Sequence, residues 1–269
     1  MDRQMGAEKL HTFVICAYKE SRYLEECIQS LLRQSYKSRI LIATSTPNDH
    51  IEELGRRYNL EICVNRDGKC IADDWNFAYR QADSKYVTLA HQDDIYEPDY
   101  VKCMLMQLER ADKPLICFSN YGEIRQGNKV KSNRLLMVKR IMLIPVYFRK
   151  LRRLKIVKRG ILSLGNPISC PSVTYVKDNM PYPVFENHFK SNLDWEAWEK
   201  ASGKKGSFEF CSRILMYHRI HEESETSALI NDRGRNREDY EMLCRFWPPY
   251  IARICHKLYS KGEESNEIS

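Results

Sequence analysis

Two kinds of sequence pattern alternate along residues 11–94, and this alternation restricts the possible folds more than any other feature of the chain. Short runs rich in β-branched, aromatic and other apolar residues are separated by longer segments in which apolar residues recur at helical spacing. The runs predicted as strands are His11–Cys16, Arg39–Ala43, Glu61–Val64 and Tyr86–Ala90, and the segments predicted as helices are Tyr23–Gln34, Ile51–Tyr58 and Asp73–Ala82. Strands that alternate with helices predict a parallel sheet with right-handed crossovers.

The rest of the chain extends this α/β core. A helix is predicted after Tyr100, a strand over Leu115–Ser119, mixed strand and helix over Ile168–His221, and a helical appendage over Asp232–Ser260. With 269 residues and 43% apolar content, the chain is long enough for one large domain with an extension. The predicted parts are a tail (1–10), a main domain (11–227) that includes a basic insert (129–160), and a C-terminal helical extension and tail (228–269).

Neither the first ten residues nor the cysteines indicate an exported protein. Residues 1–10 carry scattered charges and no apolar stretch, which is unlike a secretion signal or a membrane helix, so we expect a cytoplasmic protein. The ten cysteines include no Cys-x-x-Cys pair, and several lie in apolar runs. This pattern predicts reduced, mostly buried thiols rather than disulfides or a zinc site.

Two adjacent carboxylates, Asp93 and Asp94, follow the fourth predicted strand. Ligands of parallel sheets bind beyond the carboxyl ends of the strands, so the polar residues after strands one, two and four are expected to meet there. Paired carboxylates repel unless a cation neutralises them, and carboxylates completed by phosphates and water are a usual environment for Mg²⁺ or Mn²⁺. The alternative is that the pair caps the helix starting near Pro98 or lies in a solvated turn. A dinucleotide-binding Rossmann domain is disfavoured, because no Gly-x-Gly-x-x-Gly follows strand one.

Between His11 and Ser227 the chain resembles the family-2 glycosyltransferases of the GT-A fold. The resemblance rests on a tyrosine-containing loop after strand one, on a glycine-containing loop and helix with a characteristic asparagine, and on the paired aspartates, which match the so-called DXD motif. It implies a Rossmann-like, mostly parallel sheet flanked by helices, a nucleotide-sugar donor and Mg²⁺ or Mn²⁺. The implied donor-binding residues are Ala17, Tyr18, Glu20, Thr44, Ser45, Asn76, His91, Gln92, Asp93 and Arg219, and the implied metal ligands are Asp94 and His221.

The resemblance also implies individual roles and shows two departures. Tyr18 is expected to stack on the base, Asp93 to bind the ribose and Asp94 to hold the metal that bridges the diphosphate. Strand two, however, ends in Thr44–Thr46, where the family usually has a carboxylate pair that reads the base. His91 stands where the DXD motif often begins with an aspartate. The base is therefore left open, with a UDP-sugar as the expected donor.

Asp194 lies in Ser191–Glu199, a segment with the pattern of a helix that has carboxylates in its first turn. By itself this pattern can be a simple charge complement to the helix N-terminus. In the family that the chain resembles, an aspartate here is the catalytic base, which makes Asp194 the expected base and Glu196 the alternative. A base that takes a proton from the incoming hydroxyl, opposite the leaving diphosphate, implies inversion. Trp195 and Trp198 are expected either to form a sugar platform or to pack in the core.

The segment Tyr217–Ser224 resembles the family's closing segment, in which Arg-x-His follows the last strand. Arg219 is expected to neutralise phosphate charge, and His221 to complete the metal shell or to touch the diphosphate. The next loop is expected to close over the donor and to exclude water. Its polar residues include Ser224, Thr226 and Arg233.

The basic insert has two interpretations. Twelve Lys and Arg residues between Lys129 and Arg159 are interleaved with apolar pairs, and no acidic residue occurs between Glu123 and Asp178. In the first interpretation the insert lies on the inner, anionic face of a membrane, where each basic residue contributes about 1 kcal/mol to binding. In the second it forms a solvated helical pair over the active site. Its apolar core, Ile141–Phe148, is too short to span a bilayer. Nucleic acid is not an expected partner, because the insert has few aromatic residues and no recognised module.

Together these features predict a metal-dependent, inverting glycosyltransferase that moves a sugar from a nucleoside-diphosphate donor to a glycan or lipid-linked acceptor, as in cell-surface polysaccharide synthesis. Two other functions stay open. The fold can serve a non-catalytic nucleotide-sugar-binding partner, although such a protein has no use for Asp194. A nucleotidyltransferase usually needs a glycine-rich first loop, and Ala17–Ser21 contains no glycine.

Overall fold

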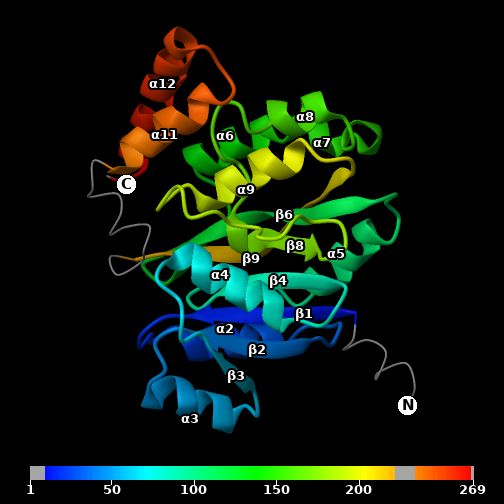
Figure 1. Ribbon diagram of the computed structural model, residues 1–269, viewed down its shortest axis with the longest axis vertical. Coiled ribbons are helices and arrows are strands. Elements are labelled where there is room, and N and C mark those ends of the chain that lie inside the picture. The colour runs from blue at the N-terminus through cyan, green and yellow to red at the C-terminus, as the bar shows by residue number, and fades with distance from the viewer. Residues whose placement is uncertain (1–9, 222–233, 268–269) are drawn as a thin grey trace.

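The computed structural model describes residues 10–221 and 234–267, and its centre is one sheet of nine strands. Eight strands follow one another across the sheet in the order β3-β2-β1-β4-β8-β6-β9-β5, and β7 pairs with β6. The first four of these, from β3 to β4, appear in this order from the bottom of Figure 1. The parallel strands outnumber the antiparallel ones, because β1, β2, β3, β4, β6 and β9 share one direction. The predicted α/β class with a mostly parallel sheet is confirmed.

The first half of the chain forms the predicted strand and helix alternation. The strands are β1 (His11–Ala17), β2 (Arg39–Thr44), β3 (Glu61–Val64) and β4 (Tyr86–His91), and the helices between them are α2 (Leu24–Leu32), α3 (Asp49–Arg57) and α4 (Ile71–Gln81). The pairs β1–β2, β2–β3 and β1–β4 are all parallel. Asn48 caps α3, since its side chain accepts a hydrogen bond from the backbone N–H of Ile51.

The second half of the sheet differs from the prediction. After α5 (Tyr100–Leu108), β6 extends over Pro114–Arg125, whereas the apolar pattern ends at Ser119. The polar residues Asn120 and Glu123 break that pattern, yet they are buried because β6 is covered along nearly its whole length. The remaining strands are β5 (Ile95–Tyr96), β7 (Asn128–Val130), β8 (Val173–Val176) and β9 (Ser207–Ile220). The short strand β8 runs antiparallel to both of its neighbours.

Short helices form most of the basic insert, and two more helices follow β9 within the described residues. The insert contains α6 (Arg134–Met142), α7 (Ile144–Tyr147), η1 (Arg149–Leu151) and α8 (Lys155–Gly160). The helical turn η2 (Cys170–Ser172) precedes β8, α9 (Leu193–Ser202) precedes β9, and the C-terminal helices are α11 (Gly234–Cys244) and α12 (Pro249–Glu267). The predicted domain boundary at 227 and 228 lies outside the described residues.

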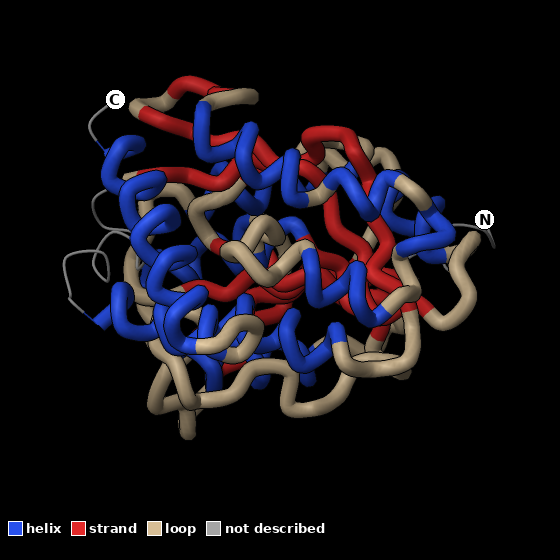
Figure 2. Tube along the Cα trace, turned by 90° about the horizontal axis from the view of Figure 1, so that it is seen from above, coloured by secondary structure: helices blue, strands red, loops and turns tan. Residues whose placement is uncertain are grey.

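Helices cover the sheet in two layers, so that strands run between helices when the molecule is seen from above (Figure 2). One core cluster joins the sheet to α4, α9, α11 and α12, and includes Trp195, Trp198 and Met242. The other joins the opposite face to α2, α3 and α5. All ten cysteines are free thiols, and within the described residues no helix is long and apolar enough to cross a membrane.

Candidate active site

Hydrogen bonds connect the loops that follow β1, β2 and β4. The backbone N–H of Tyr18 donates to Oε1 of Gln92 at 3.1 Å, and Nε2 of Gln92 donates to the carbonyl of Tyr18 at 2.9 Å. The backbone N–H of Lys19 donates to Oγ1 of Thr46. The prediction that these three strand ends meet at one edge of the sheet is therefore confirmed.

Asp93 contacts Arg219 of β9 and His221, which directly follows that strand. Nε2 of His221 lies 2.9 Å from its Oδ2, and Nε of Arg219 donates to its carbonyl oxygen at 2.8 Å. Burial alone favours the neutral acid, but the hydrogen bond from His221 and the nearby histidines outweigh it, and the pKa of Asp93 is lowered.

Asp94 is fully buried, and its two carboxylate oxygens have different surroundings. Its Oδ1 accepts from the backbone N–H of Arg219 at 2.9 Å and lies 3.0 Å from Nδ1 of His218, whereas its Oδ2 has no hydrogen-bond partner among the described residues. Burial lowers the pKa of His218, but the charges of Asp94 and Asp93 more than compensate and raise it to about 9. His218 was not predicted, although it lies in the segment that contains Arg219.

The unpartnered oxygen of Asp94 fits a divalent cation, because a buried carboxylate oxygen needs a compensating partner. No cluster of three or more His, Cys, Asp or Glu side chains that could hold a metal occurs in the described part of the chain. A site with only one or two protein carboxylates is compatible with Mg²⁺ or Mn²⁺, because substrate phosphates commonly complete the coordination of these ions. The second predicted ligand, His221, contacts Asp93 instead of Asp94.

Arg219 and His221 meet Arg22 and Tyr23, which precede α2, at a hollow of about 320 Å³. The guanidinium of Arg219 is buried, pairs with the carboxylate of Glu26 and lies 4.2 Å from the ring centre of Tyr23. The rings of Tyr23 and His221 are 5.0 Å apart, and both line the hollow together with Gly127. Arg219 thus braces Asp93 and Asp94, and Tyr23 and Glu26 are site residues that sequence patterns did not reveal.

His91 lies where the charges of three carboxylates overlap. Its ring stacks on Trp75 with the ring centres 5.0 Å apart, and its Nε2 is buried without a hydrogen-bond partner among the described residues. Burial lowers its pKa, while Asp94, Asp93 and Asp194 each act to raise it, and the net shift is downward. The aspartates of the predicted donor motif and the predicted base therefore all act electrostatically on His91.

Asp194 is the second residue of α9 and is only partly buried as a residue. Its Oδ2 accepts from Nδ2 of Asn166 at 2.8 Å, and its Oδ1 accepts from the backbone N–H of Trp195 at 2.7 Å. Burial raises the pKa of Asp194, and these two hydrogen bonds reduce the shift without cancelling it. A carboxylate with a raised pKa and an orienting partner has the properties of a general base.

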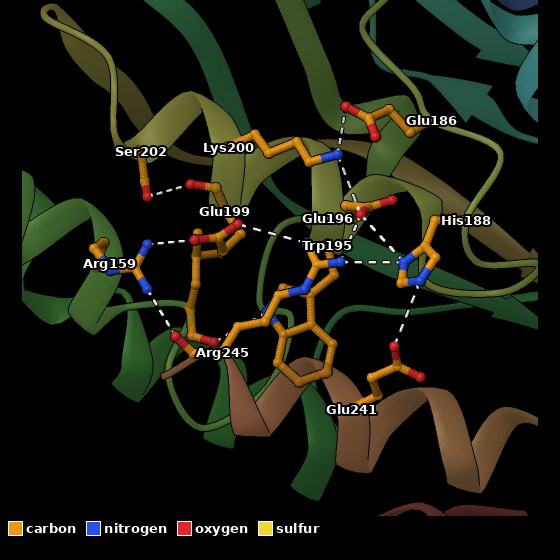
Figure 3. Close-up of polar contacts among 11 residues, drawn as sticks. Arg159, Glu186, His188, Trp195, Glu196, Glu199, Lys200, Ser202, Glu241 and Arg245 are labelled. Atoms are coloured by element: carbon orange, nitrogen blue, oxygen red, sulfur yellow. Dashed lines mark hydrogen bonds and ion pairs between the residues drawn. The ribbon is translucent and has the colours of Figure 1, made fainter. Parts of the chain in front are cut away.

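Glu196 has different surroundings, because three basic side chains converge on it (Figure 3). Its Oε1 lies 2.7 Å from Arg245, 3.2 Å from Lys200 and 3.5 Å from His188, and its side chain is 2% exposed. The structure thus places it in an ion-pair cluster that joins α9 to the end of α11. Trp195 is fully buried and, like Trp198, belongs to the core, so the packing interpretation of both tryptophans is confirmed and the sugar platform is not.

The remaining predicted donor residues are either exposed on the loop after β1 or buried. Ala17 ends β1 and is buried, whereas Tyr18 is 41% exposed and Glu20 is exposed on the loop. Thr44 is buried, and its Oγ1 accepts from a backbone N–H. The amide of Asn76 donates to one backbone carbonyl and accepts from two N–H groups of residues 184–185, which is a bracing position. The loop residues Ser224, Thr226 and Arg233 lie outside the described residues.

Asp74 supplies a carboxylate at the end of β2 that the strand itself lacks. Its Oδ2 accepts from Oγ of Ser45 at 2.7 Å and its Oδ1 accepts from Nδ2 of Asn65 at 2.8 Å. Gly68 passes so close that a Cβ there would lie 2.4 Å from Asp74 Oδ1. Asp74 belongs to α4, so only the packing of α4 against the sheet brings it to this place.

Comparisons with known proteins agree with this architecture. The family model described as glycosyl transferase family 2 matches residues 12–168, which is more than half of the chain. A relative from Rickettsia typhi, an uncharacterized glycosyltransferase, is 25% identical over 94% of this chain and 74% of its own length. Asp194, Arg219 and His221 lie beyond the interval that the family model matches.

Two solved structures share the fold. Staphylococcus aureus TarS in complex with UDP-GlcNAc matches with a TM-score of 0.60 and 17% identity over 88% of this chain and 71% of that chain. A mannosyltransferase from Pyrobaculum calidifontis in complex with GDP-Man and Mn²⁺ matches with a TM-score of 0.57 and 14% identity over 92% of this chain and 68% of that chain. With the family match and the GT-A architecture both present, the protein belongs to glycosyltransferase family 2 and is a glycosyltransferase.

Proposed function

We propose that the protein transfers a sugar from a nucleoside-diphosphate donor, a UDP-sugar first among them, to a hydroxyl of a glycan or lipid-linked acceptor in the cytoplasm. We assign the reaction to cell-surface polysaccharide synthesis, with inversion at the sugar and dependence on Mg²⁺ or Mn²⁺. The observation that carries the proposal is the fully buried carboxylate of Asp94, whose Oδ2 has no hydrogen-bond partner among the described residues. The nucleotide sugars bound by TarS and by the Pyrobaculum enzyme support such a donor.

Asp94 would hold the cation, with His221 as the second proposed ligand, and Asp93 would bind the ribose. When bound, the cation supplies positive charge that stabilises the leaving diphosphate. Tyr18 is exposed at the same edge of the sheet and is the proposed platform for the base. Asp74 is our candidate for reading the base edge, because it stands beside Ser45, where the strand has no carboxylate of its own.

Asp194 would remove the proton from the acceptor hydroxyl while the new bond to the anomeric carbon forms and the bond to the diphosphate oxygen breaks. Attack on the face opposite the leaving group inverts the configuration. Asn166 orients the carboxylate through its hydrogen bond to Oδ2. Glu196 is the poorer candidate, because its Oε1 is engaged in ion pairs with Arg245 and Lys200.

The donor assignment is tested by measuring binding of UDP-, GDP-, CMP- and dTDP-sugars with Mg²⁺, Mn²⁺ or chelator. We expect one donor class to bind only with metal. Loss of an outer-shell partner weakens a metal site by roughly 10- to 100-fold, so Asp94→Asn, which removes a direct ligand, should weaken donor binding by at least this factor. Asp83→Asn is the matched control, since the Asp83 side chain is 90% exposed. Donor binding that is equally strong with chelator, or equally strong in Asp94→Asn, would contradict the metal assignment.

We expect kcat/KM to fall at acid pH, with a midpoint above the usual pKa range of an aspartate. Burial raises the pKa of Asp194, and the base acts only when deprotonated, so the rate falls as pH drops through this raised pKa. The hydrogen bond from Asn166 lowers this pKa, so Asn166→Ala should move the acid limb to higher pH. Rate profiles of the wild type and of Asn166→Ala test this, and an unchanged limb would argue against Asp194 as the titrating group.

A further inference from the structure

Exposed apolar side chains are concentrated at one end of the molecule. Of seventeen large apolar side chains that are exposed in the described residues, nine lie within 137–164 and three lie on α12. Ile156 is 79% exposed, Phe148 63% and Ile141 59%. Single exposed apolar residues are ordinary, but a contiguous group of this size marks a binding surface.

The exposed residues follow helical spacing, so they form faces. On α12, Tyr250, Ile254 and Leu258 are four residues apart and are 68%, 61% and 69% exposed. Residues at this spacing lie above one another on one side of a helix. Arg253 and Lys257 are exposed beside them, which gives residues 249–260 of α12 a basic rim.

The insert helices and α12 are neighbours at one end of the molecule. They lie at the end of the molecule farthest from α3 (Figure 1), and α12 packs against α6. Nε1 of Trp247, just before α12, donates to the carbonyl of Ser163, just after α8, at 2.7 Å. Gly165 lies so close to α12 that a Cβ there would meet the ring of Tyr259 at 2.5 Å. We call the exposed side chains of α6, α7, η1, α8 and residues 249–260 of α12 the basic apolar surface.

The charges of this surface identify its partner. Lys150, Arg153 and Lys155 are exposed and form no ion pair within the described residues, and no acidic residue lies between Glu123 and Asp178. A second copy of the chain would bring the same positive charges face to face, which opposes association. An anionic lipid surface instead accepts apolar side chains at the acyl boundary and attracts Lys and Arg at the headgroups.

We propose that the basic apolar surface docks the enzyme on an anionic bilayer, with α12 and the insert helices lying in the interface. The loop that follows α8 contains Asn166, the hydrogen-bond partner of Asp194. Docking would therefore place the acceptor side of the site next to the membrane, where a lipid-linked acceptor is presented. This last step rests on the proposed function, whereas the docking itself does not.

The test is co-flotation of the purified full-length protein with vesicles of phosphatidylcholine alone or mixed with an equal part of phosphatidylglycerol. We expect binding to the anionic vesicles only, weakened by salt. Each basic residue near an anionic surface contributes a similar amount to the free energy of binding. Loss of two charges in Arg153→Gln/Lys155→Gln should therefore lower the vesicle partition coefficient by about thirtyfold. Ile156→Asp/Ile254→Asp should also release the protein from the vesicles, because it places charges where apolar side chains would enter the bilayer. Both side chains are exposed, so the variant should still fold.

Matched controls use exposed residues on the other helical layer. Arg33→Gln/Lys102→Gln removes the same charge, and Leu32→Asp/Met106→Asp makes the same apolar change, at exposed positions of α5 and the end of α2. The proposal is overturned if the wild type does not bind anionic vesicles, binds both vesicles equally, or is released as strongly by the control variants. It is also overturned if light scattering shows that the surface variants abolish a dimer and no vesicle binding occurs. Flotation requires neither donor nor turnover, so its failure leaves the proposed function intact.

Discussion

Asp194→Asn is expected to lower kcat by about 10²- to 10⁴-fold, the range that general acid–base catalysis contributes, while donor binding stays close to that of the wild type. Asparagine has nearly the same shape and keeps an oxygen that can accept from Asn166. The substitution removes the proton acceptor, and Asp194 belongs to α9 rather than to the loops after β1, β2 and β4 that would hold the nucleotide. Calorimetric titration of the donor together with single-turnover transfer rates separates these two effects.

Glu196→Gln is the matched control for this prediction. It changes a carboxylate two residues away on the same helix, but one that is 2% exposed and paired with Arg245. We expect it to lower the free energy of unfolding, since Arg245 and Lys200 lose their shared partner, and to change kcat much less than Asp194→Asn does. If a folded Glu196→Gln variant were inactive while Asp194→Asn kept its turnover, Glu196 would be the base and the assignment of Asp194 would be wrong.

Arg152→Met is expected to lower the free energy of unfolding by about 3–5 kcal/mol, because it leaves a buried carboxylate without its cation. Nη1 of Arg152 lies 2.7 Å from Oε2 of Glu209, and the two side chains are only 6% and 5% exposed. The same guanidinium donates to the carbonyl of Val146 at 2.7 Å and to Oε1 of Gln107 at 3.1 Å. Arg152 thereby fastens the insert helices to β9 and α5, so its loss should loosen the whole basic segment.

Urea unfolding of the purified variants measures this effect. The control is Arg153→Met, because Arg153 is exposed, and a surface substitution of this kind should change the free energy of unfolding by no more than about 0.5 kcal/mol. The double variant Arg152→Met/Glu209→Met should recover most of the loss, since replacing both members of a buried pair by apolar residues is often neutral. A double variant that is no more stable than Arg152→Met would show that the missing ion pair is not the cause.

Local patterns were sufficient for the first four strands and the helices between them. Each of these segments carries its own periodicity, and parallel strands that alternate with helices pair in only a few ways. The same logic correctly predicted that the ends of β1, β2 and β4 meet, which is seen in the contact of Tyr18 with Gln92. It was less successful for β6, whose second half is buried although Asn120 and Glu123 interrupt the apolar pattern.

The sequence by itself determined the fold class, the helices of the C-terminal extension and the positions of the motif aspartates, because these depend on residues close together in the chain. Only the tertiary structure decided which side chains surround them. His218 lies 124 residues after Asp94, Asp74 reaches the end of β2 from α4, and α12 packs against α6 of the insert. Such contacts depend on how strands pair and helices pack across long chain separations, and no local periodicity records that information.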